Sequence, residues 1–123
     1  MIRFIHCMKR RPELTAAEFR EYWNSPEFAD LVNRSADVFG AKKVTRNLTY
    51  QIELTTILMT ERGGNEEPYD AIMEMWWESP AELETLRNTD EAEQALKEMA
   101  AFQQKFVDFT RSQRFLTEWT QDT

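Results

Sequence analysis

His6 is the only histidine in the sequence and the side chain best suited to proton transfer. A neutral imidazole can take or give a proton near pH 7, as a cyclisation or a decarboxylation requires. Residues 2–9 alternate as a strand does, which places His6 on the same face as Phe4 and Met8. His6 is therefore a candidate catalytic residue. The alternative is a histidine of the core or of an interface, bonded to a neighbouring group.

Glu74 is a second candidate, because it stands between apolar residues in the middle of an expected strand. A carboxylate buried there would have a raised pKa unless a cation such as Arg46 or Arg114 paired with it. It is either a general base or one half of an interface ion pair. Tyr69 and Asp70 follow a glycine-rich loop, where they would supply polar groups at a pocket rim or simply form a turn.

Aromatic residues could form a wall for a flat ligand. Tyr22 and Trp23 lie at helical spacing from Phe19, and Trp76 and Trp77 point to opposite faces of one expected strand. Side chains at such spacings also form ordinary hydrophobic cores. Both interpretations stay open for these residues.

Several classes of function are excluded or disfavoured. One histidine and one cysteine do not make a zinc site, and three glycines provide no phosphate-binding loop. Cys7 is expected to behave as a small hydrophobic residue. The net charge of −7 opposes nucleic-acid binding, and no apolar run reaches the roughly 20 residues of a membrane span. The sequence begins without the pattern of a signal peptide, and its single cysteine cannot form an internal disulfide, so we expect a cytoplasmic protein.

The 123 residues suit a single domain, residues 1–123. Helix-capping patterns begin at Thr15, Ser25, Ser79 and Thr89. Residues 52–62 are ambiguous between helix and strand, and we favour helix. Strands are expected at residues 2–9, 42–51, 69–78 and about 109–119.

This order of elements, β-α-β-β-α-β, predicts a ferredoxin-like α+β fold with helices on one face of an antiparallel sheet. The third strand is apolar on both faces, with Met73, Met75 and Trp77 on one and Ile72 and Trp76 on the other. Helices on one side leave the other apolar face uncovered. We therefore expect a homodimer packed sheet to sheet, with one of the two tryptophans in the contact. The alternative is that a segment such as residues 52–62 covers that face.

Three stretches of sequence resemble the EthD family of the dimeric α+β barrel superfamily. They are Arg10-Arg11-Pro12-Glu13-Leu14-Thr15 with the following Glu18-Phe19-Arg20-Glu21-Tyr22-Trp23, then Tyr69 to Trp77, and the closing Arg114-Phe115-Leu116-Thr117-Glu118. The resemblance spans nearly the whole chain. It implies a homodimeric barrel that needs no metal or organic cofactor, with a ligand cavity between the sheet and the helices.

The resemblance also marks one departure from the family pattern. The family usually has a histidine four residues after the Trp of its Tyr-Trp pair, and this sequence has Glu27 there. A carboxylate at that position could still serve as a base, so Glu27 joins His6 and Glu74 as a catalytic candidate. The expected ligand-binding residues are Phe4, Tyr22, Trp23, Tyr69 and Trp77.

The relatives implied by the resemblance include monooxygenases, lyases, isomerases and cyclases that work without a cofactor. We therefore expect an enzyme that acts on a small aromatic or cyclic metabolite. A non-catalytic protein that binds a small hydrophobic ligand in the same pocket is the first alternative. A purely structural dimer that serves a partner protein is the second.

Overall fold

The computed structural model describes all residues, 1–123. The strands are β1 (Ile2–Met8), β2 (Lys43–Leu48), β3 (Ala71–Trp77) and β4 (Gln113–Glu118). The helices are α1 (Ala16–Trp23), α2 (Pro26–Val38), α3 (Glu53–Thr60), α4 (Pro80–Arg87) and α5 (Asp90–Gln103), with a short 3₁₀ turn, η1 (Phe109–Arg111). None of the helices is both long enough and apolar enough to cross a bilayer.

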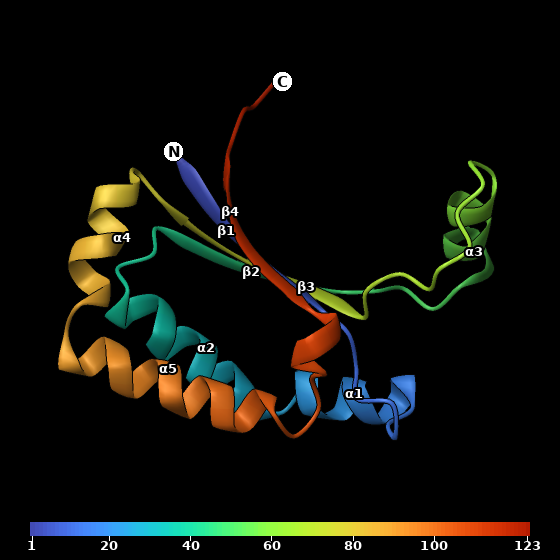
Figure 1. Cartoon of the computed structure of the whole chain (residues 1–123), viewed down its shortest axis with the longest axis horizontal. Helices are drawn as coiled ribbons and strands as arrows, with labels where there is room; N and C mark the ends of the chain where they lie inside the picture. The colour runs from blue at the N-terminus through green and yellow to red at the C-terminus, as the bar shows by residue number, and fades with distance from the viewer.

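The four strands form one antiparallel sheet in the order β2-β3-β1-β4. Helices α2, α4 and α5 lie on one side of it, and the other side carries no helix of the main body (Figure 1). This confirms the ferredoxin-like α+β fold. Because β1 is a central strand, His6 has a neighbour on each side: it pairs with Met73 of β3 and with Arg114 of β4.

The helices begin where capping residues satisfy their first amides. The hydroxyl of Thr15 accepts from the Glu18 amide, and the Glu18 carboxylate accepts from the Thr15 amide, which completes the predicted capping box. Ser25, Ser79 and Thr89 each accept a hydrogen bond from the amide three residues later.

The core lies between the helices and the sheet. The helix side of β3 is fully buried, whereas its alternate residues on the far side are only partly buried. Phe28 and Val32 of α2 and Phe102 of α5 cover that side of the sheet. Strand alternation therefore decides which side chains can reach a cavity beneath the helices.

Three strand boundaries differ clearly from the sequence expectation, and one of them is the end of β2, at Leu48 rather than at residue 51. β4 begins at Gln113 rather than near Phe109, because the Asp108 carboxylate accepts from the amide and the hydroxyl of Thr110 and holds that segment as η1. β3 begins at Ala71 rather than at residue 69. Asp70 instead accepts hydrogen bonds from the amide and the guanidinium of Arg10, each at 2.7 Å.

The segment that was ambiguous in the sequence forms the helix α3, as favoured. It lies at the end of the long connection between β2 and β3, away from the rest of the molecule (Figure 1). None of its residues is buried. Within this chain it does not cover the far side of the sheet, which remains partly exposed.

Candidate ligand pocket

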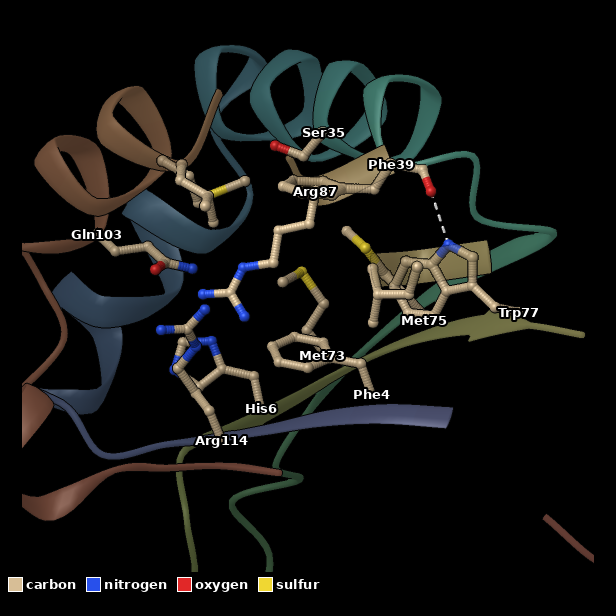
Figure 2. Close-up of a pocket in the computed structure, with 13 residues that line it drawn as sticks. Phe4, His6, Ser35, Phe39, Met73, Met75, Trp77, Arg87, Gln103 and Arg114 are labelled. Carbon is tan, nitrogen blue, oxygen red and sulfur yellow. Dashed lines mark hydrogen bonds between the residues drawn. The ribbon is translucent and has the colours of Figure 1, made fainter. Parts of the chain in front are cut away.

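A cavity of about 120 Å³ lies between the sheet and the helices. Strands β1, β3 and β4 contribute one wall, and α2, α4 and α5 contribute the other (Figure 2). Eight of its thirteen lining side chains are hydrophobic; the full lining is Phe4, His6, Ser35, Phe39, Met73, Met75, Trp77, Leu83, Arg87, Leu96, Met99, Gln103 and Arg114. Of the residues expected to form a site, the structure brings Phe4, His6 and Trp77 together here.

His6 forms part of the strand wall and is only 3% exposed. Its Nε2 is buried and has no hydrogen-bond partner. The pKa of His6 is lowered to about 4, mainly by burial and then by the positive charge of Arg114. The imidazole is therefore neutral at pH 7 and retains one basic nitrogen.

Two arginines and a glutamine make the same end of the cavity rich in hydrogen-bond donors. The nitrogen-bearing ends of Arg87, Arg114 and Gln103 converge near the His6 ring (Figure 2). Burial, and then the charge of Arg87, lowers the pKa of Arg114. The side chain of Gln103 is buried, and its Nε2 has no partner. No Asp or Glu lines the cavity to balance these groups.

The other end of the cavity is apolar. Met75 is buried on the helix side of β3 beside Phe4, and Trp77 closes this end with 2% of its surface exposed. The indole N–H of Trp77 donates to the backbone carbonyl of Phe39 at 2.7 Å, which fixes the ring (Figure 2). A ligand that filled the cavity would meet donors at one end and sulfur and aromatic surfaces at the other.

This geometry occurs in a chain whose residues 11–110 match the model of the EthD domain. The chain belongs to the EthD family. No protein with a curated description gives a significant match to the sequence.

Solved structures share the fold of this EthD protein at low sequence identity. An EthD family protein from Bacillus halodurans is 18% identical with a TM-score of 0.60, and the alignment covers 98% of this chain and 99% of the other. A protein from Arabidopsis thaliana is 10% identical with a TM-score of 0.61, over 100% and 99% of the two chains. SnoaB from Streptomyces nogalater, a cofactor-independent oxygenase, is 12% identical with a TM-score of 0.54, over 98% and 93%.

In this EthD protein, the aromatic residues of α1 lie outside the pocket. Trp23 is 3% exposed and packs against Phe28, with ring centroids 5.3 Å apart. Tyr22 stacks on Phe106 at 5.3 Å. These rings belong to an aromatic core, in which Tyr22 meets Phe102 of α5 and Trp23 meets Phe28 of α2, and neither ring lines the pocket.

The two carboxylates expected from the sequence also lie elsewhere. Glu27 is exposed in the first turn of α2, where a negative charge suits the helix N-terminus. Glu74 lies on the far side of the sheet, where Arg3 is 3.6 Å from it and the Thr45 hydroxyl donates to it at 3.3 Å. Its cation is therefore Arg3, and the expectation of Arg46 or Arg114 was wrong.

Strand alternation explains the choice of Arg3. The register places Arg46 opposite Met73 and Arg114 opposite His6, so both arginines face the helices, on the side opposite to Glu74.

Tyr69 lies on the loop before β3, away from the cavity. Its ring is 5.8 Å from the Lys9 ammonium, and the two residues line a separate polar surface depression with Glu66, Glu67 and Arg111. The structure therefore does not bring Tyr69 together with His6.

Three polar residues that complete the pocket, Arg87, Gln103 and Arg114, were not among the site residues expected from the sequence. Arg114 could have been found, because a strand paired with β1 must place some residue beside His6. Arg87 and Gln103 gave no signal, since a basic residue in the last turn of a helix and a glutamine at a helix end are both ordinary.

Proposed function

We propose that this protein is a cofactor-independent enzyme that acts on a small aromatic or cyclic metabolite held in the pocket between sheet and helices. The observation that supports it is His6: a neutral, buried imidazole whose Nε2 has no partner, in the wall of a cavity. A buried polar atom left without a partner is uncommon in a purely structural role. A ligand group would satisfy it.

In this proposal His6 acts as the general base. A substrate O–H or acidic C–H placed against the imidazole would transfer its proton to the basic ring nitrogen. The enolate, phenolate or carbanion that remains could cyclise, isomerise, expel a leaving group or react with O₂. These are the cyclase, isomerase, lyase and monooxygenase types. SnoaB is a cofactor-independent oxygenase with this fold, which supports the inclusion of the monooxygenase type.

The first test is to identify what the protein binds. Protein purified from its native source would be denatured, and the released small molecules would be measured by mass spectrometry. The compound found would then be incubated with fresh protein. We expect the native protein to convert it to a product of different mass or retention time.

Two isosteric variants make the test specific. His6→Gln keeps hydrogen bonding but cannot accept a proton near pH 7, so it should bind the compound without converting it. Glu91→Gln makes an equally small change at an exposed position of α5, outside the pocket, and should leave turnover intact. Equal turnover by His6→Gln and the native protein would contradict the proposed base.

A non-catalytic binding protein is the alternative, and one observation favours it. The family histidine is replaced by Glu27, and Glu27 is exposed and does not line the cavity. Chemistry that depends on that histidine is then absent. Release of the co-purified compound unchanged, by the native protein as well as by His6→Gln, would support this alternative.

We also propose that the protein is a homodimer packed through the far side of the sheet. Trp76 lies there between Arg3 and Lys43, whose cationic groups are 4.4 and 4.5 Å from its ring centroid, and it stacks on Trp119. Phe115 is 43% exposed on the same side. The buried Nε1 of Trp76 has no partner within the chain. Light scattering should give twice the chain mass of 14.6 kDa, and a monomer at every concentration would refute the dimer.

A further inference from the structure

The charge of the pocket differs from that of the whole molecule. The chain has 22 acidic and 15 basic residues, yet the cavity is lined by two arginines and by no acidic residue. Neither Arg87 nor Arg114 has a carboxylate within ion-pair distance. Of the eight arginines outside the pocket, four pair with carboxylates: Arg3, Arg10, Arg11 and Arg34. The pocket therefore holds positive charge that the protein itself does not neutralise.

The arrangement of these groups concentrates that charge at one end. The guanidinium groups of Arg87 and Arg114 come from α4 and β4 and are turned toward each other beside His6 (Figure 2). Both side chains are exposed to solvent at the mouth of the cavity, which weakens the repulsion between these like charges without abolishing it. An anion between them would replace the repulsion with two charge-assisted contacts, and guanidinium groups fit the planar geometry of a carboxylate.

The neutral side chain of Gln103 also favours an anion at this end of the cavity. The Gln103 side chain is buried at this end of the cavity, and its Nε2 donates to no atom of the protein. An amide N–H cannot bond a cation, and here it is directed at the space between the arginines (Figure 2). After burial, the second cause of the lowered pKa of His6 is the positive charge of Arg114, and the second cause for Arg114 is that of Arg87.

The rest of the cavity limits the size and the polarity of the remainder of the ligand. Beyond the donors, the walls are thioethers and rings: Met73 lies beside His6, Met75 lies beside Phe4, and Trp77 closes the far end. The cavity volume of about 120 Å³ is somewhat smaller than the roughly 150 Å³ apolar cavity of another protein that accepts benzene. Its interior therefore suits a body of about one ring.

We propose that the pocket binds a compact aromatic or cyclic carboxylate, with its charged group between Arg87 and Arg114 and its ring against Met73, Met75 and Trp77. This inference rests on the proposed function of the pocket and names the class of its ligand. The bound carboxylate fixes the ring beside His6, so that the imidazole meets the ring or its substituents rather than the acid group.

The test compares two probes of the same shape, benzoate and its neutral analogue benzamide. Binding to the wild-type protein is followed by NMR through the imidazole signals of His6, which need no assignment because the chain has one histidine. Benzoate should bind roughly tenfold or more tightly than benzamide, as expected for charge-assisted hydrogen bonds. Benzoate should also raise the pKa of His6, because it offsets the charge of Arg114, whereas benzamide should not.

Variants locate the effect. In Arg114→Gln and in Arg87→Gln, the preference for benzoate should fall toward one while benzamide binds as before. Arg62→Gln removes the same charge from an exposed position outside the pocket and should keep the full preference. Circular dichroism and light scattering on each variant separate loss of binding from loss of the fold.

The possible results distinguish failure of the carboxylate inference from failure of the proposed role of the pocket. Equal binding of benzoate and benzamide to the wild-type protein would refute the carboxylate inference and leave the pocket as a site for neutral rings. A preference that survives in both pocket variants would place charge recognition elsewhere and also refute it. If neither probe shifts the His6 signals at millimolar concentration, the proposed role of the pocket fails together with the inference.

Discussion

Lowering the pH from 7 to 4 should destabilise the native protein more than it destabilises a His6→Gln variant. The reason is the buried position of His6, whose pKa is lowered to about 4, first by burial and then by Arg114. In the unfolded chain the same side chain has its ordinary pKa of about 6.5. Glutamine at this position does not titrate, so the variant lacks this contribution.

The sign and size of the effect follow from proton binding. Between about pH 6.5 and pH 4 the imidazole is protonated in the unfolded chain but neutral in the native protein, so the unfolded state binds more protons. The contribution of His6 to the free energy of unfolding is therefore complete above about pH 6.5 and is lost as the pH falls toward 4. The difference between the two pKa values corresponds to about 3 kcal/mol.

Urea denaturation at a series of pH values measures this contribution. Both proteins would be unfolded at pH 7, 6, 5 and 4 at one protein concentration, because the stability of a dimer depends on concentration. The carboxylates titrate in both proteins, so their effect cancels in the difference between the two free energies of unfolding. That difference should change by about 3 kcal/mol between pH 7 and 4, in favour of the variant at low pH.

An independent measurement uses the single histidine directly. NMR titration of the imidazole should show no protonation until the pH approaches 4. In Arg114→Gln the midpoint should move up toward the ordinary value, because the second cause of the shift is removed. A midpoint near 6.5 in the native protein, or a stability difference that is independent of pH, would refute the reasoning and with it the picture of a neutral base shielded from water.

Three further substitutions test the packing that holds the pocket, each by its change in the free energy of unfolding in urea. Trp77→Ala removes a ring that is 2% exposed and should destabilise by roughly 3–5 kcal/mol; a loss below about 1 kcal/mol would contradict its place in the core. Asp70→Ala leaves the backbone amide and the guanidinium of Arg10 without their acceptor and should destabilise by about 2–3 kcal/mol. Glu67→Ala is the control, because it removes an exposed contact to the same guanidinium, and it should change stability by less than about 0.5 kcal/mol. Gly40→Ala combines a positive φ of 66° with a methyl group 2.5 Å from a leucine side chain of α4, so it should destabilise more than Gly63→Ala, which has a φ of 85° and an open surrounding; equal losses would show that the leucine simply moves aside.

Local patterns in the sequence correctly predicted where helices begin and which strand residues share a face. The capping pattern at Thr15 predicts a helix start because a hydroxyl and a carboxylate three residues apart satisfy the first amides whatever the rest of the fold does. The alternation of β1 predicts that Phe4 and His6 share a face, because successive strand residues point to opposite sides. The two-faced apolar pattern around Trp76 and Trp77 likewise predicted that one indole would be buried beneath the helices, and it is Trp77.

Local patterns were weaker where short-range hydrogen bonds compete with a strand. The segment at Phe109 has strand-like residues, yet Asp108 binds the backbone two residues later and turns it into η1. Asp70 similarly delays the start of β3 to Ala71 by accepting from Arg10, which is distant in the sequence. The hydrogen-bond partners of these side chains decide where the strand begins. The sequence shows the aspartate but not the group to which it will bond.

The sequence by itself therefore determined the fold and the face on which His6 lies, and its resemblance to the EthD family implied a cavity between the sheet and the helices. Only the tertiary structure decided which residues join His6 there. Alternation assigns a residue to a face but not to a neighbour, so the pairing of Glu74 with Arg3 and of His6 with Arg114 required the strand order and register. Arg87 reaches the same point from α4, because the packing of a helix on the sheet brings together charges that lie far apart in the sequence.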